Sequence, residues 1–89
     1  MKKLLLRAAD RLSIPPDALT NIFHLELLGD RELYLENHKG IAEYSEHEIL
    51  LRGDNKMIRI CGSGLNLDAM NDCELRVSGT IDSIAFTSL

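Results

Sequence analysis

Five side chains in this sequence are of the types that bind soft metal ions. They are His24, His38, His47, Cys61 and Cys73. Zinc sites usually draw pairs of ligands from short motifs such as C-x-x-C or H-x-x-x-H. No two of these residues have such a spacing, so the sequence predicts neither a metal site nor a cofactor. Both cysteines are expected to act as small buried hydrophobes in a compartment that keeps thiols reduced.

Acid–base chemistry would require carboxylates and a histidine around a pocket that shifts their pKa values. Glu43, Glu46 and Glu48 lie close to His47 in the sequence. They fall in a short polar link between two apolar runs, where a solvated turn is the simpler interpretation. A small ligand-binding or enzymatic domain that uses the region of His38 and His47 is the alternative.

Motifs of common enzyme classes are missing. The sequence has no G-x-S-x-G, Walker loop or dinucleotide fingerprint. The run Gly62-Ser63-Gly64 does not precede a predicted helix, whose positive dipole end would be needed to bind phosphate. The sequence therefore predicts no catalytic residues and a protein that is not an enzyme.

The segment from 33 to 41 is the most individual part of the chain. Gly40 suits a tight turn that needs a positive φ. One interpretation is a plain hairpin turn. The other is a projecting polar patch that a partner protein recognises, and the candidate partner-binding residues are Tyr34, Asn37, His38, Lys39 and Gly40.

The element that must position these residues is an antiparallel sheet. From residue 22 onward, apolar and polar residues alternate in short runs separated by turn residues. Runs that recur every eight to ten residues are too close together for parallel crossovers. Strands are predicted at 22–28, 32–37, 41–45, 48–52, 57–61, 65–69, 73–78 and 81–87.

One face of this sheet should form the core. Ile81 and Ile84 are three residues apart, so a bulge near Asp82-Ser83 is needed to keep both inside. The residues expected to point inward are Leu33, Leu35, Ile41, Ile49, Leu51, Ile58, Ile60, Leu65, Leu67, Leu75, Val77, Ile81, Ile84 and Phe86.

The predicted fold is mainly β: a short N-terminal α-helix followed by about seven or eight short antiparallel strands. A meander, a rolled sheet and a small sandwich all fit this pattern. A weak internal repeat, with Gly62 and Gly79 at equivalent places, leaves a short β-solenoid as the alternative. The predicted organisation is a helix and Pro15-Pro16 link over residues 1–16, then one β domain over 17–89.

The N-terminal segment has a composition of its own. Leu5, Ala8 and Leu12 recur at helical spacing, which predicts a short amphipathic helix over about 2–12. Its apolar side packs on the sheet, on another protein or on a membrane surface. Lys2, Lys3 and Arg7 would favour an anionic membrane only weakly.

Composition and charge exclude some partners and compartments. The 89-residue chain has a net charge of −4, whereas nucleic-acid binding needs a concentrated positive surface. No apolar run approaches the roughly 20 residues that span a bilayer, and no signal peptide is evident. A cytoplasmic protein, peripheral at a membrane if it meets one at all, is therefore expected.

Several motifs are similar to those of a known family. The run from Tyr34 to Ile41 resembles the YqfC branch of the YabP/YqfC family of sporulation proteins, and so does the pattern around Gly62 and Gly79. The resemblance extends from about Leu12 to Phe86. It implies a protein made in the mother cell of endospore-forming bacteria that works with a membrane protein, which for this branch is YqfD.

The expected function is therefore a non-enzymatic interaction or assembly module in the mother cell. Its partner would be a YqfD-like membrane protein, and copies of the chain could also pair through sheet edges. A peripheral membrane module held by the basic N-terminal helix is a second alternative.

Overall fold

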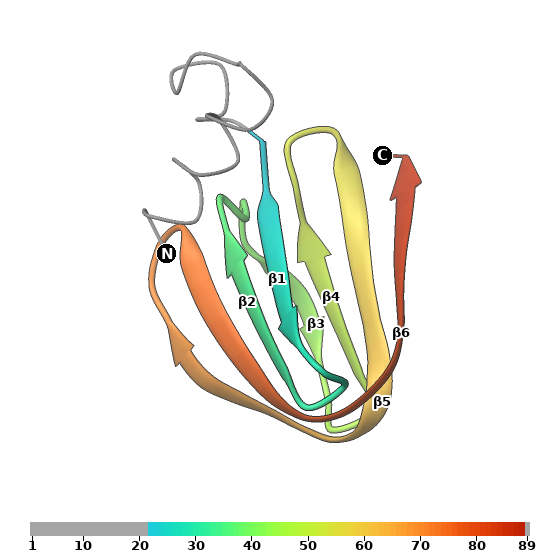
Figure 1. The fold of residues 1–89 in the computed structure, drawn as a ribbon. Coiled ribbons are helices and arrows are strands. Elements are labelled where there is room, and N and C mark those ends of the chain that lie inside the picture. Colours follow the sequence, from blue (N-terminus) through green and yellow to red (C-terminus); the bar gives the residue numbers. More distant parts are fainter. Residues whose placement is uncertain (1–21, 89) are drawn as a thin grey trace.

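A computed structural model describes residues 22–88, which form one six-stranded antiparallel sheet (Figure 1). The predicted N-terminal helix and the Pro15-Pro16 link lie outside the described residues. In chain order the strands are β1 (His24–Leu28), β2 (Glu32–Glu36), β3 (Ile41–Tyr44), β4 (Glu48–Arg52), β5 (Lys56–Met70) and β6 (Glu74–Ser88). The order across the sheet is β1-β2-β6-β5-β4-β3, with every pair antiparallel. The mainly β prediction is confirmed for these residues, and the solenoid alternative is wrong.

The eight predicted strands are in fact six, because two pairs of them are continuous. Predicted strands 57–61 and 65–69 are the two ends of β5, and 73–78 and 81–87 are the two ends of β6. The Gly62-Ser63-Gly64 and Gly79-Thr80 segments bend the long strands instead of reversing the chain. The predicted bulge is confirmed, since Cys61 pairs with Ser83 and Gly62 with Ile81, which leaves Asp82 without a partner in β5.

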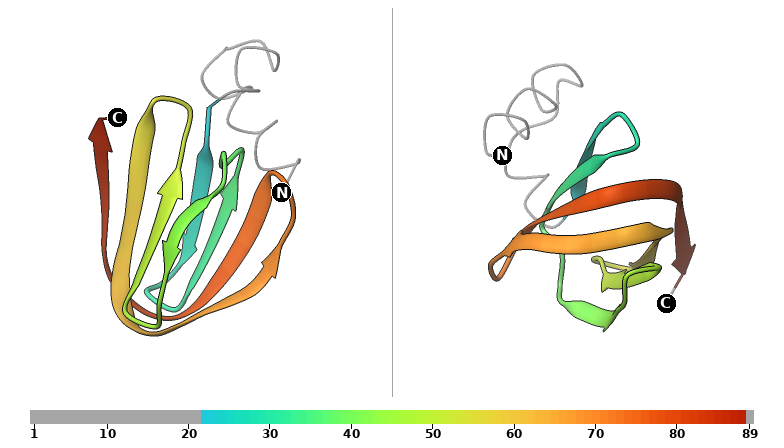
Figure 2. Two further views of the ribbon diagram at one scale, coloured as in Figure 1. Left: turned by 180° about the vertical axis from the view of Figure 1, so that it is seen from behind. Right: turned by 90° about the horizontal axis from the view of Figure 1, so that it is seen from below.

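The bend divides the sheet into two half-sheets. The first half-sheet consists of β1, β2, residues 74–78 of β6 and residues 66–70 of β5. The second half-sheet consists of β3, β4, residues 56–61 of β5 and residues 81–88 of β6. Figures 1 and 2 show how the bent β5–β6 pair carries the two short hairpins.

Glycine is required where the two long strands cross the bend. A Cβ atom at Gly62 would collide with the carbonyl oxygen of Thr80, and one at Gly79 would collide with that of Gly64. Each bend is also held by the turn of one short hairpin. The amide of Gly79 donates to the carbonyl of Arg31 in the β1–β2 turn at 3.1 Å, and the amide of Gly62 donates to the carbonyl of His47 in the β3–β4 turn at 3.0 Å. The matching positions of Gly62 and Gly79 explain the internal repeat without a solenoid.

A single core lies between the inner faces of the two half-sheets. Its fully covered side chains come from both of them, for example Leu33 and Val77 from the first and Ile49 and Ile60 from the second. Ten predicted inward residues are buried there: Leu33, Leu35, Ile49, Leu51, Ile58, Ile60, Leu65, Leu75, Val77 and Ile81. Ile41, Leu67 and Ile84 pack against it partly buried. Phe86 is the exception at 53% exposed, because it lies near the open end of β6.

Candidate functional site

Residues 37–40 connect the two half-sheets. They link β2 to β3, which lie apart in the sheet, so the hairpin-turn interpretation is wrong. This segment, called the crossover below, is anchored on both sides. The amides of Asn37 and His38 donate to the carbonyl of Cys73 at 2.6 and 3.3 Å, and the amide of Lys39 donates to that of Arg52 at 2.7 Å.

The backbone of the crossover uses two unusual conformations. Gly40 has a φ of 123°, as the sequence predicted, and Asn37 has a φ of 66°. Asparagine is among the few residues with a side chain that tolerate this left-handed region. Its side-chain amide also donates to the carbonyl of Ile22 at 3.0 Å. The crossover is therefore held in one shape by its own residues and by its neighbours.

His38 is a structural residue of this crossover. It is only 4% exposed, although the sequence suggested a projecting side chain. Its Nδ1 accepts a hydrogen bond from the amide of Gly40 at 3.0 Å, and its Nε2 lies 3.1 Å from the carbonyl of Asn71. An acceptor at Nδ1 and a carbonyl at Nε2 require the neutral tautomer with its proton on Nε2. His38 thereby ties the crossover to the turn between β5 and β6.

That turn is stabilised by an asparagine side chain. Oδ1 of Asn71 accepts hydrogen bonds from the amides of Cys73 and Glu74, at 3.0 and 2.8 Å. The backbone amide of Asn71 also donates to the backbone carbonyl of Glu74 at 2.8 Å. This Asx turn presents the preceding residue, Met70, which is 54% exposed.

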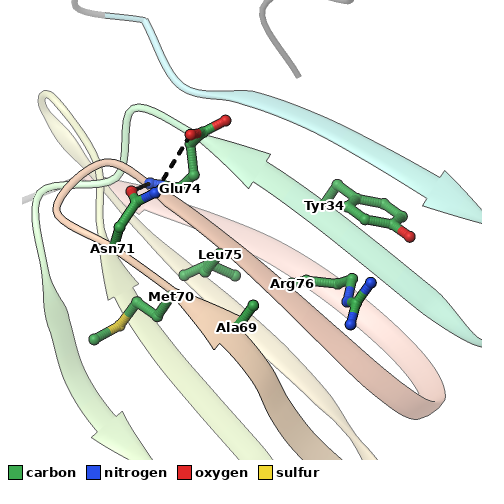
Figure 3. Close-up of a pocket in the computed structure, with 7 residues that line it drawn as sticks. All are labelled: Tyr34, Ala69, Met70, Asn71, Glu74, Leu75 and Arg76. Atoms are coloured by element: carbon green, nitrogen blue, oxygen red, sulfur yellow. Dashed lines mark hydrogen bonds between the residues drawn. The ribbon is translucent and has the colours of Figure 1, made fainter.

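Two grooves flank Met70. The crossover groove, of about 540 Å³, contains four of the five candidate residues. The outer groove, of about 350 Å³, contains Tyr34 and lies on the outer face of the first half-sheet (Figure 3). The crossover groove is lined by Asn37, His38, Lys39, Gly40, Ile41, Met70, Asn71, Asp72 and Cys73. The outer groove is lined by Tyr34, Ala69, Met70, Asn71, Glu74, Leu75 and Arg76.

The structure thus separates the candidates that the sequence placed together. Tyr34 points to the outer face, where its hydroxyl bonds the carboxylate of Glu32 at 3.2 Å. Lys39 is the exposed cation of the crossover. Met70 and Asn71 complete both grooves but were not predicted from the sequence, because they lie thirty or more residues after the crossover.

Comparisons with known proteins place the chain in a family. A family model described as the YabP family matches residues 21–89. The chain belongs to the YabP family. It is also 33% identical over 86 residues to the protein called uncharacterized protein YqfC of Bacillus subtilis (strain 168), and the match covers 97% of this chain and 89% of that relative. No solved structure matches the chain.

Other candidate groups of this YabP-family chain are dispersed. His47 lies in the exposed turn between β3 and β4, with Nε2 3.3 Å from a carboxylate oxygen of Glu46. Glu48 forms an ion pair with Arg59. The crossover groove contains His38 but neither Glu43 nor Glu48. Residues 22–88 include no group of three or more side chains arranged to hold a metal ion.

The two cysteines are also apart. Cys61 lies beside Ser83 in the β5–β6 ladder, whereas Cys73 lies in the turn at the end of these strands. Cys61 is half-buried and Cys73 is exposed, so the expectation of a buried Cys73 is wrong. Across the described part of the chain, no helix has the length and apolarity to cross a membrane.

Proposed function

We propose that this YabP-family protein is a non-catalytic protein-binding module, and that the crossover groove and the outer groove receive its partner. The observation that carries the proposal is the exposed side chain of Met70 between two grooves whose backbones are held by hydrogen bonds. Flexible, polarizable methionine side chains are common at surfaces that bind other proteins.

The composition of this surface supports a protein partner. An apolar centre formed by Met70 and Ile41 is bordered by Lys39, Asp72 and Glu74. Apolar centres with a polar rim are typical of protein–protein interfaces. The rim carries both signs of charge, which gives orientation to the docking.

A rigid surface lowers the cost of binding. His38 holds the crossover to the β5–β6 turn, and Asn71 holds the turn itself. Side chains on a preorganised backbone lose less conformational entropy when a partner binds. The buried His38 therefore contributes to the site by supporting it.

The biological setting of the proposal rests on the resemblance to the YqfC branch. We place the protein in the mother-cell cytoplasm of sporulating bacteria, with a YqfD-like membrane protein as its partner.

Site-specific photo-crosslinking in sporulating cells tests this proposal. A photoreactive amino acid at position 70 or 39 should form an adduct with the YqfD-like protein. The same amino acid at position 46, in the exposed β3–β4 turn at the far end of β3, should not. Equal adducts from all three positions, or none from 39 and 70, would contradict the proposal.

A matched pair of variants gives an independent check. Met70→Asp should reduce co-purification with the YqfD-like protein at least ten-fold, because a carboxylate replaces the apolar centre. Leu28→Asp makes a similar change at a side chain that is 51% exposed, against 54% for Met70, and should leave co-purification unchanged.

A further inference from the structure

The bend in the sheet creates free strand edges that a flat meander would not have. Within residues 22–88, β1 and β3 end the sheet. In the same part of the chain, residues 66–70 of β5 and 82–88 of β6 also have a strand on one side only, because β4 begins at Glu48, opposite Cys61, and β2 begins at Glu32, opposite Ser78. Free edges offer unpaired backbone donors and acceptors to other chains.

Three of these four edges carry features that oppose pairing. The edge of β3 has only four residues, an irregular register between Ile41 and Glu43, and the charge of Glu43. The edge of β1 has Glu26 at its centre. Bulges, short strands and charges are the usual protection of natural sheet edges.

The β5 edge is blocked more directly. The amide of Leu67 donates to the hydroxyl oxygen of Tyr44 at 3.2 Å, so one backbone donor of this edge is already used. Asp68 adds a charge, and the register with β6 shifts between Leu67 and Ala69. This edge is therefore a poor template for another strand.

The edge of β6 lacks such protection. From Ser83 to Ser88 it contains no charged residue, proline or glycine, and its register with β5 is unbroken there. Phe86 is 53% exposed on it, and β-branched and aromatic residues favour strands. Figures 1 and 2 show this end of β6 at the rim of the molecule.

We propose that residues 83–87 of β6 pair antiparallel with the same residues of a second copy, around a two-fold axis at Ala85. This goes beyond the proposed function because it uses a different surface. The axis places Ile84 opposite Phe86 of the second copy and Ser83 opposite Thr87. An isologous contact requires a strand that is complementary to itself, and an uncharged centre meets that requirement.

Side-chain matching selects this register. With the axis at Ala85, Ile84 of each copy lies opposite Phe86 of the other on one face, and Ser83 lies opposite Thr87 on the other face. An axis at Ile84 would bring Phe86 to the bulge at Asp82, and an axis at Phe86 would place Ile84 opposite Ser88, so both lose this match.

The net charge of the chain also favours the β6 edge over the other three free edges as the contact between two copies. Each chain carries a net charge of −4, so copies repel one another where carboxylates meet. The β6 edge removes that repulsion from the contact. Two short strands bury less than the roughly 1,200 Å² of a standard interface, so we expect a micromolar or weaker dimer.

Sedimentation equilibrium up to millimolar concentration tests self-association. The mass of the wild-type protein should rise from 10.0 kDa towards twice that value. Ala85→Lys should raise the dissociation constant at least ten-fold, because two like charges meet on the axis. Ala69→Lys, at an exposed alanine on the blocked β5 edge, is the matched control and should leave the dissociation constant unchanged. Circular dichroism of each variant verifies that it is folded.

Disulfide trapping tests the register. In a chain with Cys61 and Cys73 replaced by serine, Ala85→Cys should form a disulfide-linked dimer on oxidation, because residues directly opposite have Cβ atoms about 5 Å apart. Thr87→Cys should not, because its equivalent in the second copy is displaced by about 13 Å along the strand. Equal trapping at both positions would overturn the register.

A strict monomer at millimolar concentration, or a dimer insensitive to Ala85→Lys, would overturn the proposal. Neither outcome affects crosslinking from position 70, so failure of this inference and failure of the proposed function are distinguishable.

Discussion

The bent sheet meets itself along two seams, and different chemistry closes each one. At the first seam, between β1 and the C-terminal half of β6, the rings of Phe23 and Phe86 stack with centroids 5.5 Å apart. At the second seam, between β3 and the C-terminal half of β5, the Tyr44 hydroxyl accepts from the amide of Leu67. The second seam uses part of the β5 edge, whereas among residues 22–88 the side-chain stacking leaves the backbone of β6 free on this side from Ser83 to Ser88.

The seams also differ in what lies beside them. The second is continued by the crossover, where His38 binds backbone groups on both sides. Near the bend, both seams have backbone hydrogen bonds to the turn of a short hairpin, for example from the amide of Ile81 to the carbonyl of Asp30 at 2.7 Å. Farther from the bend, polar contacts close the side of the molecule that carries the grooves, and apolar contacts close the side that carries the β6 edge. Three substitutions separate these contributions.

The largest effect is expected for His38→Ala on the polar side. The variant loses a buried side chain and leaves the Gly40 amide and the Asn71 carbonyl without their partner. We expect the free energy of unfolding to fall by about 3 kcal/mol in urea titrations. Lys39→Ala, at the exposed neighbour, should change it by less than about 0.5 kcal/mol. Equal losses would mean that His38 does not hold the crossover.

A smaller loss is expected for Phe23→Ala on the apolar side. Phe23 is half-buried and stacks on Phe86, so we expect a loss of about 2 kcal/mol, below that for a fully buried ring. Ile22→Ala is the control, because Ile22 is 50% exposed and adjacent in sequence. Measurement at micromolar concentration keeps the contribution of any dimer small. A loss no larger than that of Ile22→Ala would show that the stack does not close the seam.

The smallest effect is expected for Tyr44→Phe, which removes only the hydroxyl. Tyr44 is 49% exposed, so water can replace part of the lost bond and the loss should be about 0.5–1 kcal/mol. Hydrogen exchange is the sharper measurement, since the Leu67 amide should exchange faster in this variant. Tyr34→Phe, whose hydroxyl bonds Glu32, should leave the Leu67 amide unchanged. Unchanged exchange in Tyr44→Phe would contradict the polar closure of the seam.

Local features of the fold could be predicted where one residue's neighbours in sequence decide its environment. The alternation Ile58-Arg59-Ile60 indicates a strand with one buried face, and the ends of β4 were predicted to the residue. The spacing of Ile81 and Ile84 required the bulge at Asp82, because a strand alternates strictly unless a residue is added. These results depend only on the geometry of a single strand.

The candidate site was predicted less well, because its residues come from distant parts of the chain. The buried ring of His38 forms a hydrogen bond with the carbonyl of Asn71, which lies 33 positions later in the sequence. Nothing near His38 in sequence indicates that contact. Met70 has an ordinary place at the end of an alternating run, and only the arrangement of the crossover makes it the centre of two grooves.

The sequence by itself determined that residues 22–88 form a sheet with one dry face, because side-chain alternation is a local property of a strand. Only the tertiary structure decided where the chain reverses and where it bends. Glycine permits both outcomes at Gly62 and Gly79, and the ladder between β5 and β6 continues through them. Likewise, whether residues 37–40 form a hairpin or a crossover depends on which strands β2 and β3 pair with, and those partners lie elsewhere in the chain.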